Sequence, residues 1–326
     1  MISALIALIS LGWIIRDLVT AEEPGHVWWS WAGLPRLFEN QDIWVTGLAD
    51  PVIALVCGAV AVTAMRSPSA ASSLVAAGAV TVVLRGINLW ILTEGWLGHY
   101  DDLDVHFQAL LSAGVTVGLG GALLLTAAAG RRPVGHSGYG YPPTAADEEP
   151  PRLTTGAAAT AFVLLGAVAA IWVAWEVDFF QEYGWKAYRT YLTGGEQAVG
   201  SMLGTPVRWA AVAFAVLALV AAVAALNRAV FSRPLGLAAG SAALFWGALS
   251  ISLAIKYDTF DKVMDAPLRT QLSLLSSGFF VLAGAIVLAV LARPGRRPYQ
   301  YQDSPQGWGP AGGYGPPPPS HPPPGW

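Results

Sequence analysis

Long apolar segments alternate with short polar segments along nearly the whole of this chain. Each apolar run approaches the roughly 20 residues that an α-helix needs to cross a hydrocarbon core about 30 Å thick. The pattern predicts an all-α polytopic membrane protein with eight transmembrane helices. We expect the first run to be a retained helix, because no basic segment precedes it as in a secretory signal. The runs are Ile2–Val19, Pro51–Met65, Ser72–Thr93, Phe107–Ala129, Thr155–Val177, Val207–Phe231, Leu235–Ile255 and Leu272–Leu291.

The polar segments indicate an internal duplication. Tyr100-Asp101-Asp102-Leu103-Asp104 reappears as Tyr257-Asp258-Thr259-Phe260-Asp261, and each is followed by an apolar segment and then by Arg-Arg-Pro. Such self-similarity is typical of two copies of one structural unit. Four crossings per copy would insert both copies the same way up, so we expect two tandem parallel repeats. The predicted parts are a first four-helix repeat, a disordered cytoplasmic linker, a second four-helix repeat and a disordered Gly/Tyr/Pro-rich cytoplasmic tail, at 1–129, 130–153, 154–293 and 294–326.

Composition agrees with a membrane protein and excludes several chemistries. The chain is 54% hydrophobic and 12% charged, with a mean hydropathy of +0.50, which lies outside the usual balance of soluble domains. Cys57 is the single cysteine, so disulfides and thiolate metal clusters within one chain are excluded. The sequence has no phosphate-binding Gly-Lys-Ser/Thr loop, no His-Glu-x-x-His and no Gly-x-Ser-x-Gly motif. We therefore expect no enzymatic activity, no cofactor and no nucleic-acid partner.

The distribution of charge predicts the topology in a cell membrane. Basic residues gather in alternate loops and the tail, at Arg66, Arg131, Arg132, Arg152, Arg228, Arg233, Arg293, Arg296 and Arg297. The other loops are mainly acidic, with Glu22, Glu23, Glu94, Asp101, Asp102, Asp104, Asp178, Glu182, Asp258 and Asp261. Lys and Arg concentrate on the cytoplasmic side of membrane proteins. Both termini are therefore expected in the cytoplasm, with the acidic loops outside.

Arg85 is the most informative single residue, because it lies inside an apolar run. A charge at such a position is costly unless it is paired or hydrated. Thr81 and Asn88 lie at i−4 and i+3, so the three side chains form one polar stripe that should face the bundle interior. The expected partners of Arg85 are Asp17 and Glu94, and Glu176 is the second copy's counterpart of Asp17. Arg85 is then either a structural ion pair or a contact for a substrate or ion.

The repeated Tyr-Asp loops are the best candidate motif, because they occur twice. Their carboxylates suit a divalent cation held between the loops. The spacing matches no calcium-binding loop, however, and Asp104 and Asp261 also fit the N-cap positions of the helices that follow. Capping and cation binding both remain open as roles for these loops. The candidate binding residues here are Tyr100, Asp101, Asp104, Tyr257, Asp258 and Asp261.

Aromatic and small residues suggest where partners bind. The segments 27–38 and 179–191 are rich in Trp, Tyr and Phe, so each is either an interfacial belt against the lipid bilayer or a binding platform. Gly114-x-x-x-Gly118 and Gly236-x-x-x-Gly240 permit close helix packing, within the bundle or between copies in a homo-oligomer. The tail has the composition of proline-rich segments that dock onto cytoplasmic proteins.

Two classes of function fit this sequence. The predicted midplane is almost wholly Ala, Val, Leu and Gly, and the polar residues gather in the outer third of the helices. That distribution favours a non-enzymatic scaffold or partner-binding membrane protein. The alternative is a small-solute or ion transporter or channel whose polar path runs past Arg85. A membrane enzyme using the outer carboxylates is disfavoured, because no nucleophile and general base can be assembled from the sequence.

Overall fold

The computed structural model describes residues 1–34, 44–64, 70–93, 103–129, 152–195 and 200–293. These residues are almost entirely helical. The helices are α1 (Ile2–Thr20), α2 (Pro24–Trp31), α3 (Ala49–Ala64), α4 (Ala70–Thr93), α5 (Leu103–Ala129), α6 (Thr155–Thr193), α7 (Val207–Leu226), α8 (Ser232–Lys256) and α9 (Leu268–Ala292).

Seven of the described helices are long and apolar enough to cross a membrane, namely α1 and α4 to α9. The chain is therefore a multi-pass integral membrane protein, and these helices contact the lipid bilayer. The shorter α3 has 16 residues, which corresponds to a length of about 24 Å. It covers most of the second predicted span but begins two residues earlier, at Ala49.

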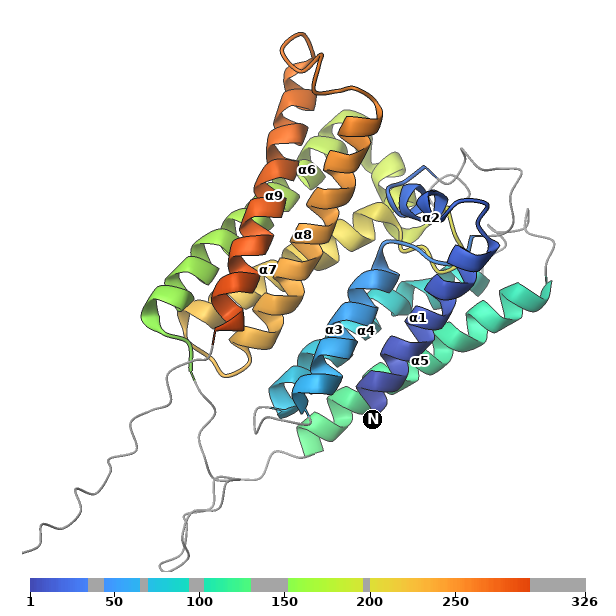
Figure 1. The fold of residues 1–326 in the computed structure, drawn as a ribbon, viewed down its shortest axis with the longest axis vertical. Coiled ribbons are helices and arrows are strands. Elements are labelled where there is room, and N and C mark those ends of the chain that lie inside the picture. The colour runs from blue at the N-terminus through green and yellow to red at the C-terminus, as the bar shows by residue number, and fades with distance from the viewer. Residues whose placement is uncertain (35–43, 65–69, 94–102, 130–151, 196–199, 294–326) are drawn as a thin grey trace, which may run out of the picture.

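The helices pack in two groups, which Figure 1 shows side by side. In the first group, α1 and α4 each pack against both α3 and α5. In the second group, α6 and α8 each pack against both α7 and α9. Helix α8 also contacts α2, α3 and α4, and α7 contacts α4. The interface between the groups is therefore built mainly on α8 and α4.

Helix α6 is longer than a membrane crossing and bends near its end. Thr154 is its N-cap and accepts a hydrogen bond from the backbone N–H of Ala157 at 3.2 Å. Gly184 interrupts the helical geometry with φ 72° and ψ 175°, a conformation that a residue with a side chain rarely adopts. The chain resumes a helix to Thr193. The aromatic segment 179–191 thus belongs to a kinked extension of α6.

Glycines let neighbouring helices approach closely inside each group. A Cβ atom on Gly284 of α9 would lie 2.7 Å from the carbonyl oxygen of Gly240 in α8. A Cβ atom on Gly78 of α4 would lie 2.8 Å from the carbonyl oxygen of Gly120 in α5. Close packing at Gly236 and Gly240 is therefore confirmed, since Gly236 also meets the Leu291 side chain.

The other predicted glycine pair behaves differently. Gly118 faces open space, and a Cβ on Gly114 would come no closer than 4.0 Å to the Leu89 side chain. Of the two alternatives for this pair, close packing within the bundle is therefore not observed. The glycines that bring α4 and α5 together are Gly78 and Gly120. Contact between copies through Gly114 and Gly118 stays a prediction.

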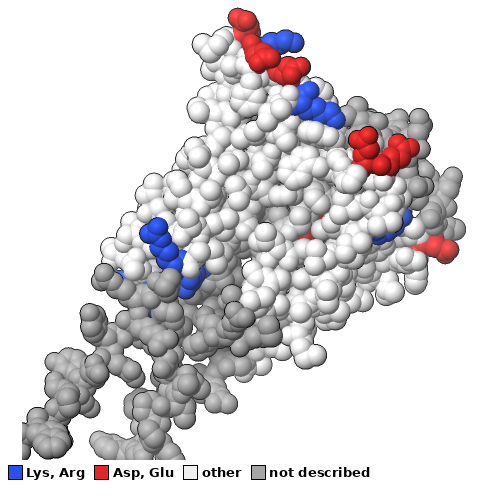
Figure 2. Space-filling view, viewed as in Figure 1, with Lys and Arg blue, Asp and Glu red and all other residues white. Residues whose placement is uncertain are grey.

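On the face shown in Figure 2, most charged side chains lie at the two ends of the helices, and the surface between them is almost wholly uncharged. The basic end carries Arg228, Arg233 and Arg293, where α7 and α9 end and α8 begins. Arg233 donates hydrogen bonds to the carbonyl oxygens of Leu291, Ala292 and Arg293. A cation there satisfies carbonyls that the end of α9 leaves without helical partners. We call the opposite end, where α1 and α8 end, the acidic end.

Candidate functional site

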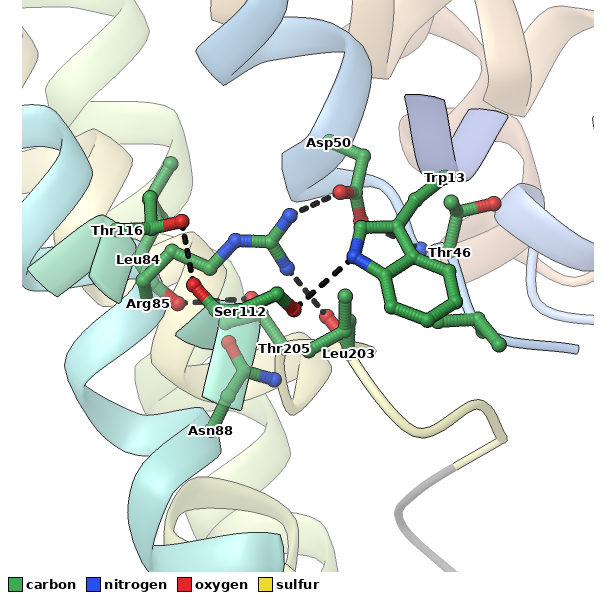
Figure 3. A network of polar contacts seen from close by, with 12 residues as sticks. Trp13, Thr46, Asp50, Leu84, Arg85, Asn88, Ser112, Thr116, Leu203 and Thr205 are labelled. Carbon is green, nitrogen blue, oxygen red and sulfur yellow. Dashed lines mark hydrogen bonds and ion pairs between the residues drawn. The ribbon is translucent and has the colours of Figure 1, made fainter. Parts of the chain in front are cut away.

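The most polar part of the interior lies between the two helix groups. We call it the polar junction and define it by the side chains of Asp17, Thr46, Asp50, Arg85 and Asn88, together with the backbone segments 44–47 and 201–205. All five side chains are at most 1% exposed. Figure 3 shows how Asp50, Arg85 and Asn88 lie beside Leu203 and Thr205 of the second group.

Arg85 of α4 forms a buried ion pair with Asp50 of α3. One guanidinium nitrogen, Nη2, donates to Asp50 Oδ1, and the other, Nη1, donates to the backbone oxygen of Leu203 at 3.4 Å. Asp50 Oδ2 accepts from the backbone N–H of Gly47 at 2.9 Å. Asp50 also lies in the first turn of α3, where the helix dipole stabilises a carboxylate. Both charges are thus neutralised within the chain.

Asp17 is not the partner of Arg85, so the predicted pairing is wrong. Its carboxylate instead accepts from the backbone N–H of Thr46 at 2.7 Å and from the Thr46 hydroxyl at 2.6 Å. It also accepts from the backbone N–H of Val45 at 3.2 Å and from Arg16 at 3.0 Å. These donors satisfy Asp17 and fix segment 44–47 against the end of α1.

The second segment, 201–205, lies against the first. The backbone N–H groups of Met202 and Leu203 donate to the carbonyl oxygens of Trp44 and Val45, at 3.2 and 2.7 Å. A Cβ on Gly47 would lie 2.8 Å from the Gly204 Cα. The two segments, one from each helix group, therefore meet backbone to backbone. Such irregular backbone is tolerated at membrane depth where protein surrounds it.

Helix α4 holds segment 201–205 and the start of α7 through three further hydrogen bonds. Asn88 Nδ2 donates to the Gly204 carbonyl oxygen at 3.2 Å. The Thr205 hydroxyl donates to the Leu84 carbonyl oxygen at 3.2 Å, and Trp209 Nε1 donates to that of Val83 at 2.9 Å. One face of α4 thus binds the second group directly.

The predicted polar stripe of α4 does face the interior, as expected. Thr81, Arg85 and Asn88 are 0%, 1% and 0% exposed. Thr81 contacts the Cys57 sulfur of α3, with 3.4 Å between the sulfur and the hydroxyl oxygen. Arg85 lies eight residues before Thr93, the last residue of α4, which is about 12 Å along the helix axis. The ion pair is therefore set well below the acidic end.

Glu176 belongs to a different ion pair, in the second group. Its Oε1 accepts from Nη1 of Arg208 in α7 at 3.0 Å. The Arg208 guanidinium carbon lies 4.3 Å from the centre of the Phe179 ring, which adds a cation–π contact. One turn deeper in α6, Trp172 packs against Phe280 with ring centroids 4.9 Å apart.

The aromatic residues of α2 form contacts within the protein. Trp28 Nε1 donates to the Ser252 hydroxyl of α8 at 2.9 Å, and its ring meets Phe245 edge-on, with centroids 5.7 Å apart. Lys256 Nζ lies 4.2 Å from the Trp29 ring centroid. These contacts join α2 to α8, so these rings also pack the two groups together.

The structure describes only part of the repeated Tyr-Asp loops. Glu94, Tyr100 and Asp101 lie outside the described residues. Asp104 is exposed in the first turn of α5, and Tyr257, Asp258 and Asp261 are exposed between α8 and α9. No group of three His, Cys, Asp or Glu side chains able to hold a metal ion occurs among the described residues. Cation binding by the complete loops stays a prediction.

The N-cap prediction for Asp261 is wrong. Helix α9 begins only at Leu268, and its N-cap is Pro267. Hydrogen-bonded turns over residues 260–266 lie between the motif and α9, and the motif gives no signal for them. Asp258 instead adopts a left-handed conformation, with φ 50°, directly after α8, as residues at helix C-termini commonly do. Asp104 lies one residue inside α5 rather than at its cap.

Sequence reasoning missed Asp50, Arg208 and the two backbone segments. Asp50 had one usable signal, because it directly precedes Pro51 at the start of an apolar run. An acid there must enter the membrane with the helix. Segments 44–47 and 201–205 carry no periodic pattern, so their insertion between the groups had no sequence signal that we can identify.

Comparison with protein-family models, curated proteins and solved structures found no match for this chain. At the polar junction both carboxylates accept several hydrogen bonds, and the guanidinium is held by Asp50 and Leu203. This arrangement suits a lock between helix groups better than an acid, a base or an open binding site.

Proposed function

We propose that this protein is a non-enzymatic membrane scaffold that binds partners through its aromatic outer segment 179–191 and its cytoplasmic tail. The observation that carries the proposal is the closure of the polar junction. Arg85 and Asp50 are 1% and 0% exposed, and they bond to each other and to the chain's own backbone. A scaffold needs a rigid core of this kind, whereas a transporter needs its polar groups to reach water.

The proposed architecture has eight crossings in two tandem repeats, with α3 as the eighth. Each helix group closes as a ring of four, and corresponding contacts occur in both. Trp13 of α1 donates to Ser112 of α5 at 3.0 Å, and Trp175 of α6 donates to Ser276 of α9 at 3.2 Å. Both groups thus have a Trp–Ser hydrogen bond between their first and fourth helices, which supports a duplicated unit, although Trp175 is not the residue that corresponds to Trp13.

We further propose that the basic end faces the cytoplasm and the acidic end faces outwards. Arg228, Arg233 and Arg293 cluster at the basic end, and such clusters mark the cytoplasmic side. The linker and the tail follow α5 and α9 at that end. Both termini are then cytoplasmic, which puts the tail where cytoplasmic proteins can bind it.

Truncation after Gly295 tests the scaffold directly. The expected result is normal insertion and stability, with loss of specific cytoplasmic proteins from a crosslinked pull-down of the full chain. A matched variant keeps the tail's length but replaces Tyr299, Tyr301, Trp308 and Trp326 by Ser, and it should lose the same proteins. An unchanged partner list in both variants would contradict the proposal.

One observation favours the alternative, a small-solute or ion transporter with a path past Arg85. Two irregular segments, 44–47 and 201–205, meet beside a buried ion pair, and transporters build substrate sites from interrupted backbone near charges. Reconstituted vesicles separate the two functions. Proton, sodium or potassium flux that disappears in Arg85→Leu would favour transport, and flux no greater than in empty vesicles would favour the scaffold.

A further inference from the structure

The ion pair between Glu176 and Arg208 leaves hydrogen-bonding capacity unused. Glu176 is 7% exposed, and its carboxylate also interacts with the Tyr188 hydroxyl. Its Oε2 nevertheless has no hydrogen bond of standard geometry among the described residues. Arg208 Nε is likewise buried and without a partner there. Buried polar atoms in proteins are nearly always hydrogen-bonded, and an unpaired one is costly. The pair therefore presents one acceptor and one donor that await a ligand.

A third unpaired atom lies on the same face of α6. Trp172 Nε1 is a buried donor without a partner among the described residues, and Trp172 precedes Glu176 by one turn. The corresponding indole of the first group, that of Trp13, has its partner in Ser112. In the polar junction, in contrast, both carboxylate oxygens of Asp17 and of Asp50 accept hydrogen bonds. Asn88 Oδ1 is the junction atom without a partner among the described residues.

The charges of this pair identify the kind of ligand. Arg208 is balanced by Glu176 and covered on one side by the Phe179 ring, so a charged ligand would find no opposite charge. A hydroxyl group donates one hydrogen bond and accepts others, and it can therefore serve Glu176 Oε2 and Arg208 Nε together. Phe179 also contacts the rings of Tyr183, Tyr188 and Tyr191, which offer apolar faces to a polyol ring.

The depth of the pair suits a lipid headgroup. Glu176 lies 21 residues beyond Thr155, the first residue of α6, which is about 32 Å along the helix. That length equals the thickness of the hydrocarbon core, so Glu176 reaches headgroup level if α6 enters at the other interface. Arg208 lies in the first turn of α7 and its side chain is 21% exposed. The pair is thus at the edge of the protein.

We propose that Glu176 and Arg208 form a binding site for a neutral hydroxyl-bearing group, such as the polyol headgroup of a membrane lipid or a free polyol. Glu176 Oε2 accepts the hydroxyl hydrogen, Arg208 Nε donates to the hydroxyl oxygen, and the rings around Phe179 cover the carbon face. This site is independent of the tail, since it rests on contacts of α6 and α7 alone. It shares the rings around Phe179 with the aromatic segment that the scaffold proposal uses.

Native mass spectrometry of the full chain in phosphatidylcholine nanodiscs tests the site. Phosphatidylinositol and phosphatidylglycerol have headgroup hydroxyls, and phosphatidylmethanol has the same phosphate without them. We expect two- to tenfold greater retention of a hydroxylated lipid, the range that about one net hydrogen bond provides. A second assay measures the thermal unfolding of the protein in nanodiscs of phosphatidylcholine alone, with free inositol or glycerol added. A rise in the unfolding temperature, together with no preference among the lipids, would identify a soluble polyol as the ligand.

Two variants and one control assign the binding to the pair. Glu176→Met with Arg208→Met removes both unpaired atoms and should abolish the preference. Arg208→Lys keeps a cation beside Glu176 but removes Nε, and it should lower the preference even if the double variant folds poorly. The control is Lys256→Met, which removes a cation at the same end of the molecule but on α8, where it lies 4.2 Å from the Trp29 ring centroid. Equal retention of all lipids without a thermal shift would mean that these atoms hold water only, and a preference that survives both variants would also overturn the proposal.

Discussion

The ion pair of Arg85 and Asp50 shows how single residues stabilise the interior of this membrane protein. Each charge would be costly alone in a region from which water is excluded. The Arg85 guanidinium donates to the Asp50 carboxylate and to a backbone carbonyl oxygen. The Asp50 carboxylate accepts from Arg85 and from a backbone N–H. The neighbouring pair of Arg16 and Asp17 differs, because the Arg16 side chain is 29% exposed. Loss of Arg16 would therefore cost less.

We predict that Asp50→Leu and Arg85→Leu each lower the free energy of unfolding by about 3–5 kcal/mol, because each leaves one buried charge unpaired. The double variant should recover much of that loss. The measurement is unfolding of the purified protein by titration with a denaturing detergent, followed by tryptophan fluorescence. Arg269→Leu is the control and should have a much smaller effect, because its bridges are exposed. A free energy of unfolding equal to that of the unmodified protein in both single variants would contradict a structural role for the pair of Arg85 and Asp50.

The sequence predicted which side of α4 is buried but not what lies against it. Thr81, Arg85 and Asn88 share a helical face, and helical periodicity alone places that face inwards. Arg85 pairs with Asp50 and not with Asp17 because the backbone N–H groups of segment 44–47 donate hydrogen bonds to the Asp17 carboxylate. That segment has no periodic pattern. Local geometry was therefore predictable, whereas pairing across the fold was not.

At the scale of elements, the long apolar runs gave helix positions that the structure largely reproduces. The last predicted span, Leu272–Leu291, lies inside α9 (Leu268–Ala292). Larger differences occur where helices continue beyond the apolar run. Helix α6 extends past Val177 to Thr193. This outer part is helical although many of its residues are aromatic or charged. Hydropathy marks the part of a helix in lipid, not its end.

Glycine positions provide a test at this scale. Gly284→Ala places a methyl group 2.7 Å from backbone atoms of α8, so it should force α8 and α9 apart and cost about 1–3 kcal/mol. Gly118→Ala is the matched control in α5 and should be neutral or slightly stabilising, because open space surrounds that position. Thermal unfolding of both variants in the same detergent compares them. Equal destabilisation would contradict the packing described for α8 and α9.

At the scale of the whole molecule, the two helix groups are joined by three kinds of contact. The backbone of 202–203 bonds to that of 44–45, α4 binds residues 203–209, and Trp28 of α2 binds Ser252 of α8. The ion pair of Arg85 and Asp50 lies among them. A movement that opened a path past Arg85 would break several of these bonds together. We therefore infer that the polar junction stays closed.

The accessibility of a cysteine at position 203 measures whether the junction is closed. Both variants are made in a Cys57→Ala background. Leu203→Cys puts a thiol in the polar junction, where the native Leu203 is 1% exposed. Tyr257→Cys puts a thiol on the turn after α8, where the native Tyr257 is 53% exposed. Nanodiscs give a membrane-impermeant thiol reagent access to both faces. A closed junction predicts labelling at Leu203→Cys at least about 100-fold slower than at Tyr257→Cys, since it requires local opening of the fold. Comparable labelling rates would show that water reaches the junction, and would contradict the scaffold in favour of a transport path.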